Sequence, residues 1–461
     1  MRLLPHQVGL VETFFNPGSK RVVVLRAEVG LGKSSALVAL VSRLLRERPS
    51  ARVLFLVAAA ALRTQFVEML HEADVPTLSV DRYRYRELLD AAAGKEIWPA
   101  GAVVVLTREF ARQEDVRGAL TTRWDLLVLD EAHQFGGALA KELVRTVSQA
   151  SERVVLTILP NLNLPDAFPE DDATVVQWRR EQVVDHDGKP LDVVPRPSLH
   201  LVSFTLSPAE LILAQTVSEA CRILEAGTTE QRWVARSLLH SLQSSPAALE
   251  NGLRRIAEAK NAAAQSGEAL LEPSEEDSLG DQFRGWVDRP SAEKVAGIAT
   301  RALSELEAIR GDSKFAAFGG LLTHLTEVKT SSPRICVLTE YLSTLFYLAA
   351  EIENLGQTCH VLHGGMNTEG RQRSLALFSD GGILASTRAA ISEGVALGQV
   401  TDLILYDIPG AKLALHQVLG RFDRLGRRTQ LRVHALAASN SIDGFVDGAL
   451  ELLREVLSVP A

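Results

Sequence analysis

Cysteine and long apolar segments are both scarce in this chain. Only three cysteines occur among 461 residues, Cys221, Cys336 and Cys359, and no pair of them has CxxC spacing. This scarcity argues against a disulfide framework or a zinc motif and favours a reducing compartment. No apolar segment reaches the ~20 residues that a membrane-spanning helix needs. The first residues also lack a signal-peptide pattern, so we expect a cytoplasmic protein with no membrane partner.

Positive charge is also in short supply. The chain carries 49 Lys and Arg against 57 Asp and Glu, a net charge of −8. The molecule as a whole is therefore not a polycation, and any contact with nucleic acid must use a local basic surface. Hydrophobic residues make up 46% and charged residues 23%, which is typical of globular proteins. The length suits two or three domains.

Two parts of the chain alternate between short β-branched segments and longer amphipathic ones. The first series is Arg21–Ala27, Arg52–Val57, Ala102–Leu106, Leu126–Asp130 and Arg153–Thr157. The second is Arg334–Thr339, His360–Leu362, Ile383–Ser386, Asp402–Tyr406 and Leu431–Ala435. Such apolar segments favour strands buried on both faces of a parallel sheet. Alternation with helices predicts the α/β class, with two doubly wound lobes in tandem.

The middle of the chain has another character. Residues 161–200 are rich in Pro, Asp and Arg and predict an irregular connection. Residues 207–265 and 293–327 predict helices, and residues 268–292 predict an exposed acidic loop. We therefore expect a first lobe in residues 1–165, a linker and mostly helical insert in 166–328, and a second lobe in 329–461.

A phosphate-binding loop is predicted by AEVGLGKS at residues 27–34, which follows a strand and opens a helix. Gly30 and Gly32 allow backbone N–H groups to surround the phosphates of ATP. Lys33 would contact the β- and γ-phosphates, and the Ser34 hydroxyl would bind Mg²⁺. A glycine-rich turn without a ligand is the alternative, which Gly-Lys-Ser in this context disfavours.

A carboxylate pair follows the apolar segment that ends at Leu129, in DEAH at residues 130–133. A carboxylate at the carboxyl end of a central strand faces the ligand crevice of an open sheet. We expect Asp130 to hold Mg²⁺ and Glu131 to act as the general base on water. An acidic helix N-cap is the alternative, but a phosphate-binding loop about a hundred residues earlier favours the site.

Two arginines stand three residues apart in HQVLGRFDRLGR at residues 416–427. This spacing places Arg421 and Arg424 on one helical face. Their planar guanidinium groups suit phosphate oxygens. If the second lobe closes on ATP, both can neutralise charge on the γ-phosphate in the transition state. A solvated basic helix end is the alternative.

These three motifs, in this order, resemble those of the superfamily 2 helicases, in which two RecA-like lobes clamp ATP. In the segment PHQ at residues 5–7, the resemblance implies that Gln7 contacts the base. SEGV at residues 392–395 resembles the motif that contacts ATP and the nucleic-acid backbone, which implies a nucleotide contact at Gly394. By the same resemblance, the positions that contact the nucleic-acid strand are Thr107, Arg108, Thr339 and Thr387.

The Swi/Snf-like branch, particularly its bacterial members, provides further resemblance. It is carried by WRR at 178–180, DHDG at 185–188, FTLSPAE at 204–210, SSPAAL at 244–249 and DSK at 312–314. Members mostly translocate on duplex DNA, often without separating its strands. The resemblance therefore implies ATP hydrolysis and phosphate contacts with double-stranded DNA. The chain carries no recognisable nuclease or methyltransferase, so we expect protein partners to supply such a function or targeting.

One departure concerns the first lobe's coupling motif, LTILPN at residues 156–161. Leu159 stands where the family has a second hydroxyl residue, and leucine cannot donate a hydrogen bond. This predicts an effect on the coupling of hydrolysis to movement rather than on hydrolysis itself. Two alternatives stay open beside the translocase: a strand-separating DNA or RNA helicase, and an ATP-gated scaffold that hydrolyses slowly.

Overall fold

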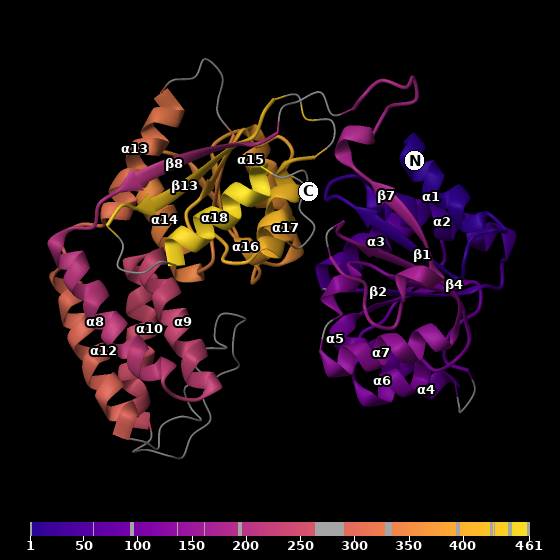
Figure 1. Ribbon diagram of the computed structural model, residues 1–461, viewed down its shortest axis with the longest axis horizontal. Helices are drawn as coiled ribbons and strands as arrows, with labels where there is room; N and C mark the ends of the chain where they lie inside the picture. Colours follow the sequence, from indigo (N-terminus) through magenta and orange to yellow (C-terminus); the bar gives the residue numbers. More distant parts are fainter. Residues whose placement is uncertain are drawn as a thin grey trace.

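The computed structural model describes residues 2–58, 60–92, 96–135, 137–160, 162–191, 196–262, 290–327, 334–392, 397–424, 427, 429–440 and 445–458. Figure 1 shows two α/β lobes beside each other and a helical bundle next to the second lobe. The predicted fold class is confirmed, because both sheets are parallel and the bundle lies between them in sequence. None of the described helices has the length and apolarity needed to cross a membrane.

The first lobe is a sheet of described strands in the order β3-β4-β2-β5-β6-β1-β7. Its strands are β1 (Val22–Ala27), β2 (Arg52–Val57), β3 (Thr77–Ser79), β4 (Ala102–Thr107), β5 (Trp124–Leu129), β6 (Ser151–Ile158) and β7 (Ala173–Trp178). Its helices are α1 (Pro5–Phe15), α2 (Lys33–Glu47), α3 (Ala60–Glu72), α4 (Arg82–Ala92), α5 (Arg108–Ala111), α6 (Glu114–Ala119) and α7 (Ala138–Gln149).

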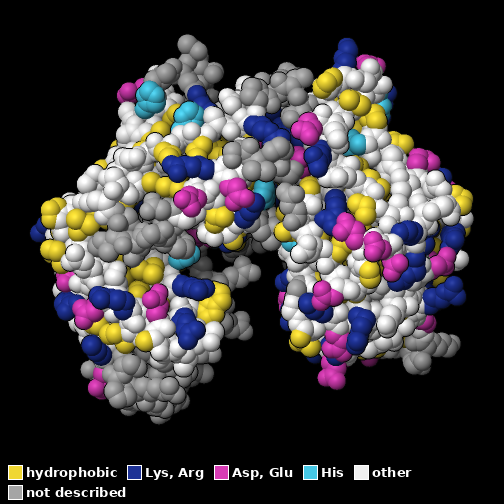
Figure 2. Space-filling model, in the orientation of Figure 1, with side chains coloured by type: hydrophobic (Ala, Val, Ile, Leu, Met, Phe, Trp, Pro, Cys, Tyr) yellow, Lys and Arg dark blue, Asp and Glu magenta, His cyan; other side chains and the backbone are white. Residues whose placement is uncertain are grey.

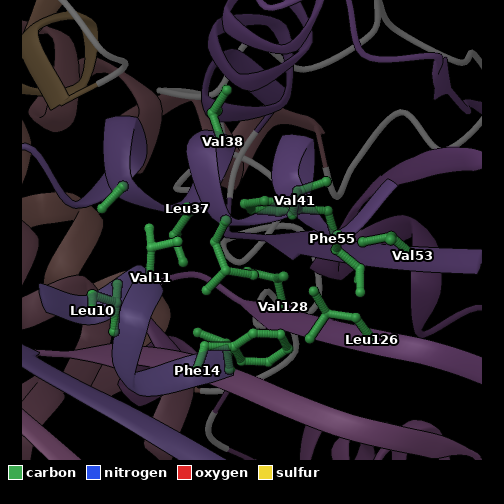
Figure 3. Close-up of a cluster of buried hydrophobic side chains, with 14 of the residues drawn as sticks. Leu10, Val11, Phe14, Leu37, Val38, Val41, Val53, Phe55, Leu126 and Val128 are labelled. Carbon is green, nitrogen blue, oxygen red and sulfur yellow. The ribbon is translucent and has the colours of Figure 1, made fainter. Parts of the chain in front are cut away.

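Central strands of this lobe are buried on both faces, which explains their unbroken apolar sequences. In β5, Leu126 and Val128 enter one hydrophobic cluster, while Leu127 and Leu129 enter the cluster on the other face. Figure 3 shows Leu126 and Val128 packed near Phe55 in the first of these clusters. Successive side chains of a strand point to opposite faces, so a doubly covered strand needs apolar residues at every position. This packing holds the carboxyl end of β5, where the carboxylates begin, in a rigid place.

The second lobe is a sheet in the order β10-β11-β9-β12-β13-β8. Its strands are β8 (Ser198–Phe204), β9 (Ile335–Thr339), β10 (Cys359–Leu362), β11 (Ile383–Thr387), β12 (Asp402–Leu405) and β13 (Arg432–Ala438). Its helices are α13 (Ser313–Glu327), α14 (Leu342–Asn354), α15 (Thr368–Asp380), α16 (Arg388–Ser392), α17 (Lys412–Phe422) and α18 (Phe445–Ser458).

The helical bundle comprises α8 (Pro208–Glu225), α9 (Thr229–Ser244), α10 (Pro246–Ala262) and α12 (Pro290–Ala308), which share a hydrophobic core of their own. The predicted helices of the insert are therefore confirmed. Side chains of Ser207 and Thr228 cap α8 and α9, each in a reciprocal capping box. Residues 268–289 of the predicted acidic loop lie outside the described residues, and residues 290–292 begin α12.

The prediction of an irregular connection over residues 161–200 is wrong at two places. β7 pairs with β1 in the first sheet, and β8 pairs with β13 in the second. Both strands lie at the ends of their sheets and mix buried or half-buried residues with exposed ones. An edge strand has fewer apolar residues than a central strand that is buried on both faces, so its sequence is harder to recognise. Nearby prolines obscured the pattern further. Residues beyond the predicted boundary at residue 165 therefore contribute one strand to each of the two sheets.

A buried polar cluster joins the bundle, α13 and the second lobe. The Lys314 ammonium lies 3.1 Å from the Asp407 carboxylate, and both side chains are about one-tenth exposed. Asp407 also accepts hydrogen bonds from the hydroxyls of Ser244, at 2.8 Å, and Thr339, at 2.5 Å. These bonds connect the end of α9, α13 and the ends of β9 and β12 through one carboxylate.

Replacing Asp407 by alanine is expected to lower the free energy of unfolding of the second lobe by about 3 kcal/mol. The reason is that Lys314 would stay buried without its partner. Urea titration followed by amide hydrogen exchange in β9 and β12 measures this loss. The matched control is Asp166→Asn, an exposed partner of Lys141, which should cost under about 1 kcal/mol. Equal effects of both substitutions would contradict the expectation.

Candidate nucleotide site between the two lobes

The predicted phosphate-binding loop lies between β1 and α2, at the carboxyl edge of the first sheet. Gly30 has φ +85° and Gly32 has φ +78°, a left-handed conformation that favours glycine. A Cβ on Gly32 would lie 2.2 Å from Nε2 of Gln7. That nitrogen donates to the Gly32 carbonyl at 3.2 Å, and Gln7 is 6% exposed. Gln7 thus supports the loop in this arrangement; its predicted contact with the base stays a prediction.

The two carboxylates lie directly opposite this loop. Oε1 of Glu131 is 3.0 Å from Nζ of Lys33. Glu131 has φ +53°, a conformation that is uncommon for a residue other than glycine and that sits at a site of expected chemistry. The Thr157 hydroxyl donates to Oδ1 of Asp130 and accepts from the Glu131 N–H, both at 2.8 Å. Thr157 is fully buried, so it fixes both carboxylate residues from β6.

Burial and charge separate the two carboxylates electrostatically. Burial, together with the neighbouring Glu131 charge, raises the pKa of Asp130 above its usual range. Burial also acts to raise the pKa of Glu131, but the Lys33 ammonium outweighs it, and the pKa falls below its usual value. Glu131 is therefore the ionised, base-competent member of the pair.

Arg421 and Arg424 of the second lobe meet this site across the interface. The prediction that they share one helical face is wrong, because α17 ends at Phe422 and Arg424 follows its C-cap, Asp423. Burial lowers the pKa of Arg421, while the nearby Glu131 and Asp130 carboxylates act in the opposite direction. A Cβ on Gly30 would lie 3.5 Å from Cα of Arg424, and Nε of Arg424 is buried without a hydrogen-bond partner in the described part of the chain. The structure thus brings both arginines, which are about 290 to 390 residues away in sequence, to the phosphate-binding loop and the carboxylates.

Further contacts hold the lobes together around this site, and no motif in the sequence assigned a function to them. Arg180, after β7, forms an ion pair with Asp423 of the arginine segment. The Arg180 N–H donates to Oε2 of Glu28, in the phosphate-binding loop, at 3.2 Å. Arg180 and Asp423 both lie in segments that carried the family resemblance, and that was their only signal in the sequence.

Gly420→Ala is expected to lower ATP turnover by roughly tenfold to a hundredfold, because catalytic geometry tolerates displacements of only about 1 Å. A Cβ on Gly420 would lie 2.0 Å from Cγ1 of Val29, across the interface between the lobes. Alanine favours helix over glycine, so α17 itself should not be weakened. Steady-state ATP turnover measures the effect.

Two variants separate this contact from a general effect on folding. Val29→Gly in the Gly420→Ala background should restore part of the lost turnover, because it removes the colliding side chain. Gly320→Ala, in α13, adds a methyl group where nothing lies within 4 Å, and should leave turnover unchanged. Lack of rescue by Val29→Gly would contradict the interlobe explanation.

The four predicted nucleic-acid contacts lie at the carboxyl ends of strands. Thr107 and Arg108 are half-buried after β4, where the Thr107 hydroxyl caps α5 by accepting from the Phe110 N–H at 3.3 Å. Thr339 and Thr387 end β9 and β11 and are 1% and 5% exposed. In this arrangement, nucleic acid could therefore contact Thr339 and Thr387 only through their backbone groups. Gly394 lies outside the described residues.

A divalent cation at this site would depend on few protein ligands. Ser34 is half-buried at the start of α2, and the Asp130 carboxylate lies within the electrostatic influence of Lys33. The described residues contain no cluster of His, Cys, Asp and Glu large enough to hold a metal ion by itself. Mg²⁺ commonly combines one or two protein oxygens with substrate phosphates, so Ser34 and Asp130 fit the prediction of magnesium bound with ATP.

Comparison with known proteins identifies the family. Residues 5–159 match the DEAD/DEAH box helicase family and residues 314–426 match the helicase conserved C-terminal domain. The "RNA polymerase-associated protein RapA" of Sodalis glossinidius and that of Vibrio campbellii are each 24% identical over 94% of this chain. Each alignment covers 47% of the relative, so the chain spans about half the length of these proteins.

A solved structure, "Crystal structure of Pyrococcus furiosus Hef helicase domain", has the same fold. The TM-score is 0.53 at 15% identity, over 95% of this chain and 96% of that one. The two family matches together cover more than half of the chain and contain the loop, the carboxylates and the arginines in the expected order. The chain therefore belongs to the ATP-hydrolysing superfamily 2 helicases, with relatives in the Swi/Snf-like branch.

Proposed function

We propose that this protein is an ATP-driven translocase whose main track is double-stranded DNA, and that it hydrolyses ATP between its two lobes. The observation that carries the proposal is the convergence at one interface of Lys33, Glu131 and Arg421. Neither lobe contains all three. Hydrolysis therefore requires closure of the lobes, and closure in turn gives a movement that nucleic acid can respond to.

Each residue has a distinct part in this reaction. Lys33 and the N–H groups of the phosphate-binding loop bind and orient the phosphates. Ser34 and Asp130 would hold Mg²⁺, which neutralises phosphate charge when bound. Glu131 accepts a proton from the attacking water, which its lowered pKa and its position beside Lys33 permit.

The arginines complete the site from the opposite lobe. Arg421 stabilises negative charge that develops on the transferring phosphoryl group, and Arg424 lies next to the loop at Gly30. Burial of both guanidinium groups strengthens these interactions, because the effective dielectric constant is lower away from water.

Coupling of hydrolysis to movement rests on β6. Thr157 connects this strand to both carboxylate residues, while Leu159, two residues later, is buried and offers no hydroxyl. We propose that Thr157 alone transmits the state of the nucleotide site through this segment. Hydrolysis should therefore be coupled to movement more loosely than in a chain with both hydroxyls, and more ATP should be consumed per step.

The proposed track and partners rest on the motifs that resemble those of the Swi/Snf-like branch. The name of the RapA relatives associates those proteins with RNA polymerase. For this chain we propose double-stranded DNA, bound through its phosphates, and a protein partner that supplies targeting, nuclease or methyltransferase function. We further propose that the protein acts in the cytoplasm.

ATP turnover of the purified protein, measured with duplex DNA, single-stranded DNA and RNA, tests this function. We expect duplex DNA to stimulate turnover more than tenfold, and Lys33→Ala to abolish the stimulation. Displacement of a third strand from a blunt triplex, without unwinding of a forked duplex, would support the translocase. Unwinding of the fork would favour a strand-separating helicase instead. No turnover with any nucleic acid would leave the ATP-gated scaffold.

A further inference from the structure

Helix α9 presents an exposed face on which arginine and tryptophan lie together. Arg232, Trp233 and Arg236 are all exposed, and Trp233 is 58% exposed. The guanidinium carbon of Arg236 lies 6.0 Å from the centre of the Trp233 ring. The opposite side of the helix, with Val234 and Leu238, is buried in the bundle core. Folding of the bundle therefore leaves the indole in solvent, where its apolar surface contributes nothing to the core.

This α9 face also carries positive charge that no carboxylate of the described residues pairs with. Within the described part of the chain, neither Arg232 nor Arg236 forms an ion pair with a carboxylate; Arg232 donates to the Gly227 carbonyl at 3.3 Å. On neighbouring helices the pattern is different, since Arg254 pairs with Glu250 and Arg301 with Glu219. A local basic surface on a chain of net charge −8 is what a contact with phosphate requires.

The position of α9 connects this face with the second lobe. Figure 1 shows α9 on the side of the bundle that faces the first lobe, and Figure 2 shows a hollow there between bundle and lobe. At the carboxyl half of α9, the Tyr341 hydroxyl donates to the Ser237 carbonyl at 3.3 Å. His240, one turn further, lies within the electrostatic influence of Glu340 and Asp407.

The residues at this junction include one of the predicted nucleic-acid contacts. Thr339 directly precedes Glu340 and Tyr341 at the carboxyl end of β9. Two carboxylates lie at this junction, and both have a cationic partner: Arg388 lies 2.5 Å from Glu340, and Lys314 lies 3.1 Å from Asp407. A strand of nucleic acid that passes Thr339 would therefore reach the α9 face without crossing an unpaired carboxylate of these residues.

We propose that the α9 face, formed by Arg232, Trp233 and Arg236, binds nucleic acid and extends the track of the second lobe onto the helical bundle. The proposal rests on the proposed function, because it needs nucleic acid on the second lobe. The guanidinium groups bind phosphates and release counterions. The indole offers a flat apolar surface for an unpaired base or for the sugar edge of a duplex.

Equilibrium binding of the 461-residue chain to labelled duplex DNA and single-stranded DNA, each across a salt series, tests this proposal. Trp233→Ala should weaken binding roughly tenfold. Arg232→Ala with Arg236→Ala should make the slope of log affinity against log salt shallower by about two on duplex DNA. Turnover of ATP without nucleic acid should not change in either variant, because these residues lie outside the nucleotide site.

Matched controls come from the same bundle. Lys294→Ala with Arg301→Ala removes two positive charges from α12, which lies on the side of the bundle away from the first lobe. Ile212→Ala removes an apolar side chain of similar exposure, 54%, from α8. Both controls should keep the wild-type affinity and salt slope.

The two DNA probes decide which surface the indole contacts. A Trp233→Ala defect confined to single-stranded DNA supports stacking on a base, and a defect on both probes supports packing against sugar and phosphate. Wild-type affinity and salt slope in both α9 variants would overturn the proposal and would leave this face to a protein partner. If the unaltered protein bound neither probe, the proposed function would fail together with this extension of it.

Discussion

Replacing Arg421 by alanine is expected to reduce the turnover number for ATP by about a thousandfold, with little change in the affinity for ATP. Arg421 lies across the interface from Lys33 and within the electrostatic influence of Asp130 and Glu131. Positive charge at that position matters most when negative charge builds up during phosphoryl transfer, and arginine fingers of this kind are worth ~10³–10⁵ in rate. Binding of ATP depends chiefly on the first lobe and should survive.

Single-turnover hydrolysis with saturating ATP and duplex DNA measures this effect, and calorimetric titration measures ATP affinity separately. Arg421→Lys keeps the charge without the planar fork and should recover only a small part of the rate. Arg373→Ala removes an exposed arginine from α15 of the same lobe and should have no effect. A loss smaller than about tenfold in Arg421→Ala would show that this guanidinium does not stabilise the transition state.

Glu131→Gln is the second substitution with a large expected effect, a loss of about 10²–10⁴ in hydrolysis while ATP stays bound. Glutamine keeps the shape of the side chain but cannot accept the proton of the attacking water. The hydrogen bond from the Glu131 N–H to Thr157 belongs to the backbone and should persist. The lobes should consequently remain closed on uncleaved ATP.

Two measurements check this expectation: hydrolysis in a single turnover, and affinity for duplex DNA in the presence of ATP. The affinity should equal or exceed that of the wild type. Glu47→Gln, at the end of α2, removes a carboxylate that pairs with Arg43 at the surface and serves as the control. Loss of ATP binding in Glu131→Gln would instead assign a structural role to the Lys33–Glu131 ion pair.

The central strands of both sheets could be predicted because burial on two faces demands continuous apolar sequence. The segment Arg52–Val57 coincides with β2, and the other predicted strands fall within a few residues of the observed ones. β3, β7 and β8 were not predicted. The first has only three residues, and the other two lie at sheet edges, where polar side chains alternate with apolar ones. Their places depend on pairing with strands far away in sequence.

Local sequence was enough to predict those parts of the nucleotide site that come from a single short motif. The loop at Lys33 and the carboxylates at Asp130 and Glu131 each follow a buried strand, so their positions at the sheet edge were predictable. Thr157 was noted only as part of a coupling motif, and its bonds to both carboxylate residues became evident in three dimensions.

The amino-acid sequence by itself determined the α/β class, the two lobes and the chemical groups that each lobe brings to the interface, because these depend on periodicity and on short motifs. Only the tertiary structure decided how the halves fit: Val29 against Gly420, Arg180 paired with Asp423, and α9 turned towards the first lobe. Contacts between distant segments arise from the complementary shape and charge of folded surfaces, which leave no periodic signal along the chain.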